Sequence, residues 1–157
     1  MMRIVVLSDS HGDVSSLRMA VKNEPDAKHV IFLGDGIFDI EAAEDVLADK
    51  IVYAVKGNCD SRFVSDHPKK ITAAIGGKNF YITHGDNERV KFGLDALRLA
   101  AHISGSDIAL FGHTHIPYVH YEEGIYFFNP GSVRENYYGV IDITDNGVMC
   151  FHKKIAT

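Results

Sequence analysis

The hydrophobic pattern of the first third of the chain alternates between two periodicities. Three short apolar runs are typical of buried strands, at residues 3–7, 29–33 and 51–55. The two intervening stretches each carry one apolar helical face, with Val14, Leu17 and Val21 in the first and Ile37, Ile40, Ala43 and Leu47 in the second. Asp13 stands where it can cap the first helix. This pattern predicts a βαβαβ unit whose parallel strands have their carboxyl ends at one sheet edge.

The second half of the chain consists mostly of short strands. We expect these at residues 71–74, 79–83, 108–111, 118–121, 125–128, 138–143 and 148–152. A helix over residues 94–104 ends at Gly105, and Gly76-Gly77 forms a turn between the first two strands. Short turns predict that the later strands are antiparallel. The whole pattern predicts an α/β fold in one domain, residues 1–157, with two mixed sheets flanked by helices as a four-layer αββα sandwich.

Composition narrows the function classes. The formal net charge of −5 and a pI near 5.9 give no basic surface for a nucleic-acid polymer or an anionic membrane. The first residues are expected to form a strand rather than a membrane span or a signal peptide. The two cysteines, Cys59 and Cys150, form no disulfide framework, so we expect a cytoplasmic protein.

Polar residues follow each of the first three predicted strands. Asp9 and His11 come after the first, and their i, i+2 spacing in an extended segment places both side chains on one side. Asp35 lies between two glycines after the second strand, and its two oxygens could bridge two metals. Asn58 and Asp60 follow the third strand. Taken singly, each of these residues is more typical of turn or cap chemistry.

Histidines follow two strands of the second half. His84 ends one strand, and His113 and His115 follow another with i, i+2 spacing. An isolated His-x-His is equally consistent with a metal ligand and with a solvated pair. Because five strands each end in a candidate ligand, the joint pattern favours a metal site.

The motifs DSH (residues 9–11), GD (34–35), GNCD (57–60), THG (83–85) and GHTH (112–115) resemble those of the calcineurin-like metallophosphoesterases. The resemblance is closest to the compact YfcE-like phosphodiesterases, which also carry NPGS, here at residues 129–132. It implies that one metal is bound by Asp9, His11 and His115. It implies that the other is bound by Asn58, His84 and His113, with Asp35 bridging the two.

The resemblance implies a phosphodiesterase that hydrolyses a small phosphoester through a hydroxide bridging two divalent cations, with Asp35, Asn58 and His84 acting through that hydroxide. Manganese is expected by analogy with the family, with Fe, Zn, Co or Ni as alternatives. Two other functions stay open. One is a phosphomonoesterase acting on nucleotides or small phosphoproteins, and the other is a non-catalytic scaffold like the related retromer subunit VPS29.

Cys59 and Asp60, inside GNCD, and Arg134, just after NPGS, are further candidates for a role at the site. Cys59 stands where many larger family members have a catalytic histidine, and a packed, unreactive thiol is the more favoured interpretation. Asp60 is a weak catalytic candidate that could orient a ligand or a neighbouring loop. Arg134 could hold the substrate phosphate, or be a solvated surface residue.

The aromatic cluster of Tyr126, Phe127, Phe128, Tyr137 and Tyr138 is expected to lie in the sheet core rather than on a dimer face. A homodimer is slightly favoured for so small a chain with surplus aromatic residues.

Overall fold

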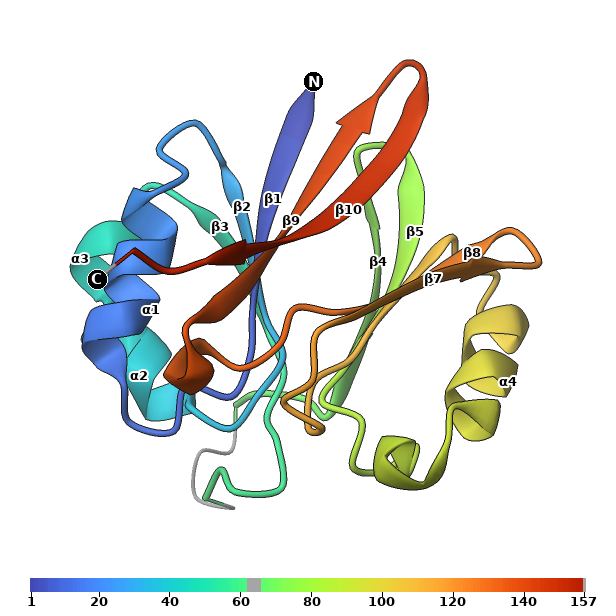
Figure 1. Cartoon of the computed structure of the whole chain (residues 1–157), viewed down its shortest axis with the longest axis horizontal. Helices are drawn as coiled ribbons and strands as arrows, with labels where there is room; N and C mark the ends of the chain where they lie inside the picture. The colour runs from blue at the N-terminus through green and yellow to red at the C-terminus, as the bar shows by residue number, and fades with distance from the viewer. Residues whose placement is uncertain (62–65, 157) are drawn as a thin grey trace.

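A computed structural model describes residues 1–61 and 66–156 as two five-stranded sheets packed face to face (Figure 1). The first sheet has the order β10-β9-β1-β2-β3. Its strands are β1 (Met2–Leu7), β2 (His29–Phe32), β3 (Ile51–Ala54), β9 (Tyr137–Thr144) and β10 (Gly147–Lys154). The second sheet has the order β4-β5-β6-β8-β7. Its strands are β4 (Lys70–Ile75), β5 (Lys78–Thr83), β6 (Ile108–Leu110), β7 (Tyr118–Glu122) and β8 (Ile125–Asn129).

Helices lie on the outer side of both sheets (Figure 1). The first sheet is covered by α1 (Val14–Lys22), α2 (Ile37–Ala42) and α3 (Glu44–Leu47), and the second by α4 (Asp95–Ile103). Two short 3₁₀ helices, η1 (Val90–Phe92) and η2 (Val133–Glu135), complete the described elements. The αββα sandwich predicted from the sequence is therefore confirmed.

The pairing of β6 and the helical segment before β3 differ from prediction. Strand β6 pairs in parallel with both β5 and β8, so the expectation of antiparallel later strands is wrong for it. After β8 the chain crosses to the first sheet, where β9 pairs antiparallel with β1. The single helical stripe predicted before β3 is divided at Ala43 into α2 and α3.

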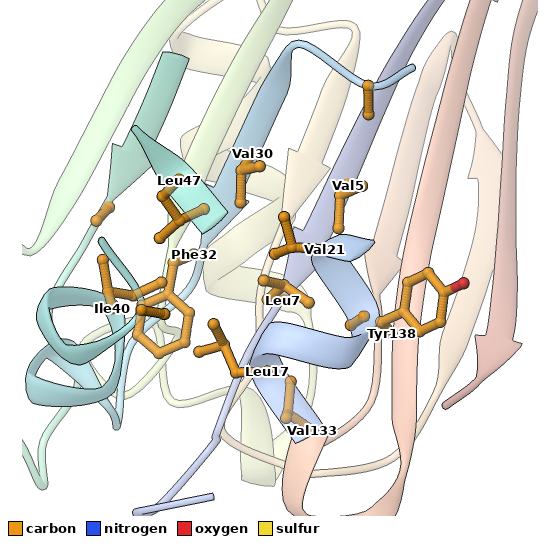
Figure 2. Packing of buried hydrophobic residues seen from close by; sticks show 14 of the residues in the cluster. Val5, Leu7, Leu17, Val21, Val30, Phe32, Ile40, Leu47, Val133 and Tyr138 are labelled. Carbon is orange, nitrogen blue, oxygen red and sulfur yellow. The ribbon is translucent and has the colours of Figure 1, made fainter. Parts of the chain in front are cut away.

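Three apolar clusters hold the layers together. The cluster between the sheets includes Ile4, Val6, Ile31, Phe80, Ile82, Phe128 and Ile141. A second cluster lies between the first sheet and α1–α3, where Val5 and Leu7 meet Leu17, Phe32 and Tyr138 (Figure 2). The third lies under α4 and includes Tyr81, Leu97 and Phe127. Both faces of β1 are thus buried, which explains its continuous apolar run.

The aromatic cluster is divided between core and partly exposed positions. Phe127, Phe128 and Tyr138 are buried, which confirms the core prediction for these three. Tyr126 and Tyr137 are only partly buried. In the part of the chain that the structure describes, no helix has the length and apolar character needed to span a membrane.

A buried carboxylate ties α1 to three strands of the first sheet. Glu24, just after α1, accepts hydrogen bonds from the Arg3 guanidinium at 2.9 Å, the Tyr138 hydroxyl at 2.9 Å and the Lys153 ammonium. Burial alone would raise the pKa of Glu24, but these bonds outweigh it and hold the pKa below its ordinary value of 4.5.

We predict that Glu24→Gln lowers the free energy of unfolding by about 1–3 kcal/mol at pH 7, because Arg3, Lys153 and Tyr138 lose a charged acceptor. The pKa of Glu24 is depressed on folding, so its stabilisation is present above pH 4.5 and is lost as the pH falls through the folded pKa. Urea unfolding at pH 7 and pH 3 measures this. The exposed control Glu44→Gln should change stability by less than about 0.5 kcal/mol, and an equal loss in both variants would contradict the assignment.

Candidate metal centre

The seven predicted ligands lie at one common edge of the two sheets, the lower edge in Figure 1. Strands β1, β2 and β3 run parallel and end just before Asp9, Asp35 and Asn58. Strands β5 and β6, also parallel, end just before His84 and the His113–His115 loop. The carboxyl ends of parallel strands meet at one edge, so residues far apart in the sequence converge there.

The first group of donors comprises Asp9, His11 and His115. The Nε2 atoms of His11 and His115 are 3.2 Å apart, and they lie 3.5 Å and 3.1 Å from Oδ1 of Asp9. Asp9 is fully buried. Two imidazole nitrogens and a carboxylate oxygen therefore face one small space.

The second group of donors surrounds His84. Its Nε2 lies 3.1 Å from Asn58 Oδ1, 3.1 Å from His113 Nδ1 and 3.2 Å from Asp35 Oδ2. The Nδ1 of His84 lies 2.7 Å from the Leu33 carbonyl, to which it can donate its proton. That hydrogen bond fixes the tautomer and leaves the lone pair of Nε2 free for a cation.

Asp35 lies between the two groups. Its Oδ2 is 3.2 Å from Nε2 of His84 and 3.8 Å from Nε2 of His11, while Oδ1 accepts the Cys59 N–H at 2.8 Å. One carboxylate oxygen, rather than both as the sequence suggested, therefore faces a histidine of each group.

The fit of this cluster to cations can be judged from Asp9. Its Oδ2 accepts hydrogen bonds from the Ser8 hydroxyl and the His113 N–H, but its buried Oδ1 has no hydrogen-bond partner among the described residues. A buried carboxylate oxygen without a partner is costly, and a cation would satisfy it. Carboxylate, amide and imidazole donors without a thiolate suit divalent transition metals. The residues therefore fit the metals that the sequence implied.

Left-handed backbone brings the ligands together. Asp9, His11, Asp35, His113 and His115 all have positive φ, between 44° and 68°. Such angles are uncommon for residues other than glycine and are concentrated at functional sites. The extended geometry expected for Asp9 and His11 is therefore wrong, because both residues follow the end of β1 and have positive φ. Their side chains still converge, by way of this left-handed backbone.

Asp60 holds two of the ligand-bearing loops. One oxygen accepts the N–H groups of Asp35 and Gly57 at 2.8 Å each, and the other accepts those of Gly36 and Ile37 at 2.9 and 3.1 Å. With both oxygens engaged by backbone N–H groups, the carboxylate orients the loops of Asp35 and Asn58. It faces the backbone rather than the space between the histidines.

Two glycines leave room for the carboxylates. A Cβ at Gly57 would lie 2.1 Å from Asp35 Oδ1, and one at Gly112 would lie 2.7 Å from Asp9 Oδ2. Neither contact is possible, so each glycine allows close approach of backbone and ligand.

Sequence reasoning missed an outer layer of polar residues that orient the ligand loops. Asp39 accepts the Ser10 hydroxyl at 2.6 Å and the Gly12 N–H at 2.8 Å, which holds the turn carrying His11. Ser132 donates to the Asp9 carbonyl at 2.8 Å, and Asn129 donates to the Gly112 carbonyl at 3.0 Å. The NPGS motif was the available signal for Asn129 and Ser132.

The remaining two candidates lie beside the cluster. Arg134 is exposed in η2, and its backbone N–H lies 3.4 Å from the Asp9 carbonyl. Cys59 is also exposed, and its sulfur lies within 4.8 Å of donor atoms of His11 and Asp35. Burial and the charge of Asp35 raise the pKa of the Cys59 thiol above its ordinary value of 9.0, so it stays protonated at neutral pH.

Asp35 and His84 each shift the pKa of the other. Burial would raise the pKa of Asp35, but its contact with His84 outweighs burial and lowers it to about 2. Burial would lower the pKa of His84, but Asp35 and Asp9 outweigh it and raise that pKa. The pKa of His113 is lowered, first by burial and then by His84 and Lys91. His113 is thus held neutral, the form in which imidazole binds metals.

Two mixed sheets face each other, and a carboxylate–imidazole cluster lies at their common edge. This combination is that of the metallophosphatase-type α/β sandwiches. The model of the calcineurin-like phosphoesterase superfamily domain matches residues 2–146, and this chain belongs to that family.

Curated relatives agree with this assignment. The probable metallophosphoesterase YsnB of Bacillus subtilis is 32% identical over 134 residues, covering 85% of this chain and 76% of the relative. The phosphodiesterase YfcE of Escherichia coli K12 is 29% identical, covering 85% of this chain and 80% of the relative.

Solved structures share the fold. An archaeal phosphodiesterase superimposes with a TM-score of 0.77 at 22% identity, covering 97% of this chain and all of the other. A single mutant of Vps29 from Entamoeba histolytica superimposes with a TM-score of 0.73 at 20% identity, covering 99% of this chain and all of the other. At these identities the likeness concerns the fold, which enzymes and other proteins can share.

We predict that His113→Ala and His115→Ala each bind about one Mn²⁺ per chain where the unsubstituted protein binds about two, because each removes a ligand from a different group. Equilibrium dialysis with elemental analysis measures the stoichiometry, and the double variant should bind almost none. The control His120→Ala, at an exposed histidine outside both groups, should keep full binding. Loss of both ions from either single variant would contradict two separable sites.

Proposed function

We propose that this chain is a metal-dependent phosphodiesterase that hydrolyses small phosphodiesters. The observation that carries the proposal is the pair of donor groups that share Asp35. Asp9, His11 and His115 would hold one divalent cation, and Asn58, His84 and His113 the other. Mn²⁺ is the proposed metal, with Fe, Zn, Co and Ni as alternatives of similar ligand preference.

When bound, two adjacent divalent cations offset the negative charge of the phosphoryl oxygens and supply a nucleophile by lowering the pKa of coordinated water. The chain's own contribution is to position the donors. Asp60 and Asp39 hold the loops of Asp35 and His11, and the Leu33 carbonyl orients His84. Arg134 is exposed and its backbone N–H lies 3.4 Å from the Asp9 carbonyl, and we propose that its guanidinium would hold a phosphate oxygen.

Two observations favour a diester over a monoester. YfcE, which resembles this chain over most of its length, is named a phosphodiesterase. The chain carries a formal charge of −5, and although Lys91 is exposed beside His113, Lys69 is paired with Asp86 at 2.8 Å. A diester has one negative charge where a monoester has up to two, so it requires fewer cationic side chains.

The protonation of Cys59 bears on the leaving group rather than on the choice between diester and monoester. A thiol whose pKa is raised is a weak proton donor near neutral pH, so it gives little help to a poor alkoxide leaving group. Among phosphodiesters, as among phosphoesters generally, those with good leaving groups should therefore be hydrolysed best.

We predict that the Mn²⁺-loaded protein hydrolyses bis(p-nitrophenyl) phosphate with a higher kcat/KM than p-nitrophenyl phosphate. Asp35→Ala should lower the diesterase kcat/KM by more than about 100-fold, beyond the ~10–100-fold effects of residues that only orient ligands. Release of p-nitrophenolate measures both. The control Asp49→Ala, at an exposed carboxylate after α3, should keep the activity.

The possible outcomes separate the functions under consideration. A higher kcat/KM for the monoester would indicate a phosphomonoesterase. No turnover of either ester by protein that binds two Mn²⁺ ions would indicate a non-catalytic scaffold of the same fold.

A further inference from the structure

An apolar cavity opens beside the second donor group. Its volume is about 510 Å³, within the ~300–1,000 Å³ range of small-molecule sites. Thr114, which lies between the candidate ligands His113 and His115, also lines this cavity. The cavity and the metal centre therefore share one loop, and a molecule bound at the cations could extend into the cavity.

Apolar and aromatic side chains form most of the cavity wall. Val90 and Phe111 lie at its base and are almost fully buried. The rings of Phe111 and Tyr118 have centroids 5.9 Å apart and are tilted by 60°. Gly85, next to His84, allows this base to form, because a Cβ there would lie 2.8 Å from a methyl group of Val90. Leu94 and Ile116 complete the apolar lining.

Two polar groups border the same space. The Thr114 hydroxyl accepts hydrogen bonds from Asn129 at 3.0 Å and from the Ile116 N–H at 3.2 Å, so its own hydrogen is free to be donated. Lys91 contributes an exposed ammonium group, and the cavity lining includes no carboxylate among the described residues. The cavity thus combines aromatic surface with hydrogen-bond donors and positive charge, which complements a planar ring bearing acceptor atoms.

We propose that this cavity binds the nucleobase of a substrate in which a nucleoside is one ester substituent of the phosphodiester. The inference rests on the proposed function and names its substrate class. The base stacks on Tyr118, an interaction that aromatic side chains make with any base. Its ring acceptors face Thr114 and Lys91, while the phosphate lies at the donor cluster. A hydrocarbon chain would use the apolar wall but would make no hydrogen bond with Thr114 or Lys91.

The test is calorimetric titration of Mn²⁺-loaded protein with three phosphates that differ in one substituent. These are adenosine 5′-monophosphate, ribose 5-phosphate, which lacks the base, and hexyl phosphate, which is apolar but has no ring. We expect adenosine monophosphate to bind about tenfold or more tightly than the other two. Equal affinities for adenosine monophosphate and ribose 5-phosphate, or tight binding of hexyl phosphate, would overturn the proposal.

Matched variants locate the effect. Tyr118→Ala should reduce the preference for adenosine monophosphate over ribose 5-phosphate to about threefold or less, whereas Tyr121→Ala, an exposed tyrosine on the same strand outside the cavity, should leave it unchanged. Tyr118 packs on Phe111, so its removal could also disturb folding. A second pair of variants at exposed positions avoids this. Ile116→Ser, in the cavity wall, should reduce the preference for adenosine monophosphate, and the control Ile103→Ser, on α4, should not. An unchanged preference in Ile116→Ser and Tyr118→Ala would overturn the proposal.

Methyl p-nitrophenyl phosphate is a diester without a base. Its hydrolysis tests the proposed phosphodiesterase activity separately from the proposed nucleobase site. If the unsubstituted protein hydrolyses it but shows no preference for adenosine monophosphate, the assignment of the cavity alone fails. If it hydrolyses neither this diester nor bis(p-nitrophenyl) phosphate, the proposed function fails.

Discussion

The buried carboxylate of Asp9 imposes the main electrostatic constraint on this protein. One of its oxygens has no hydrogen-bond partner among the described residues, and two imidazole nitrogens lie within 3.5 Å of it. Asp35 adds a second buried carboxylate a short distance away. Burying such groups without compensation is expensive, and the structure supplies only part of the compensation through hydrogen bonds. The cluster is therefore arranged for cations rather than for stability of the metal-free chain.

That constraint explains the local backbone. Five of the seven candidate ligands adopt left-handed angles, and each such residue costs free energy that the surrounding packing must outweigh. Rigid strands buried on both faces provide that packing, and the carboxylates of Asp60 and Asp39 hold the turns by bonding their N–H groups. Thr114, which lines the apolar cavity, lies between the left-handed residues His113 and His115. We therefore propose that the same loop positions both the metal ligands and the substrate.

The order of elements and the site's location could be predicted because both follow from local pattern. Apolar runs located the strands within about one or two residues, and polar residues at their ends indicated the site. The parallel pairing of β6 could not be predicted, because a strand of three residues carries no signal of its partners. The left-handed backbone at Asp9 and His11 was also missed, since aspartate and histidine tolerate both conformations. Asp39 was missed because it lies in a helix, outside every motif.

The proposed mechanism requires that two cations share Asp35. A crystal structure of the Mn²⁺-loaded protein, with anomalous scattering recorded at the manganese edge, tests this most directly. We expect two peaks roughly 3.5–4 Å apart, one among Asp9, His11 and His115 and the other among Asn58, His84 and His113, with Asp35 between them. A single peak, or two peaks that do not contact Asp35, would contradict it.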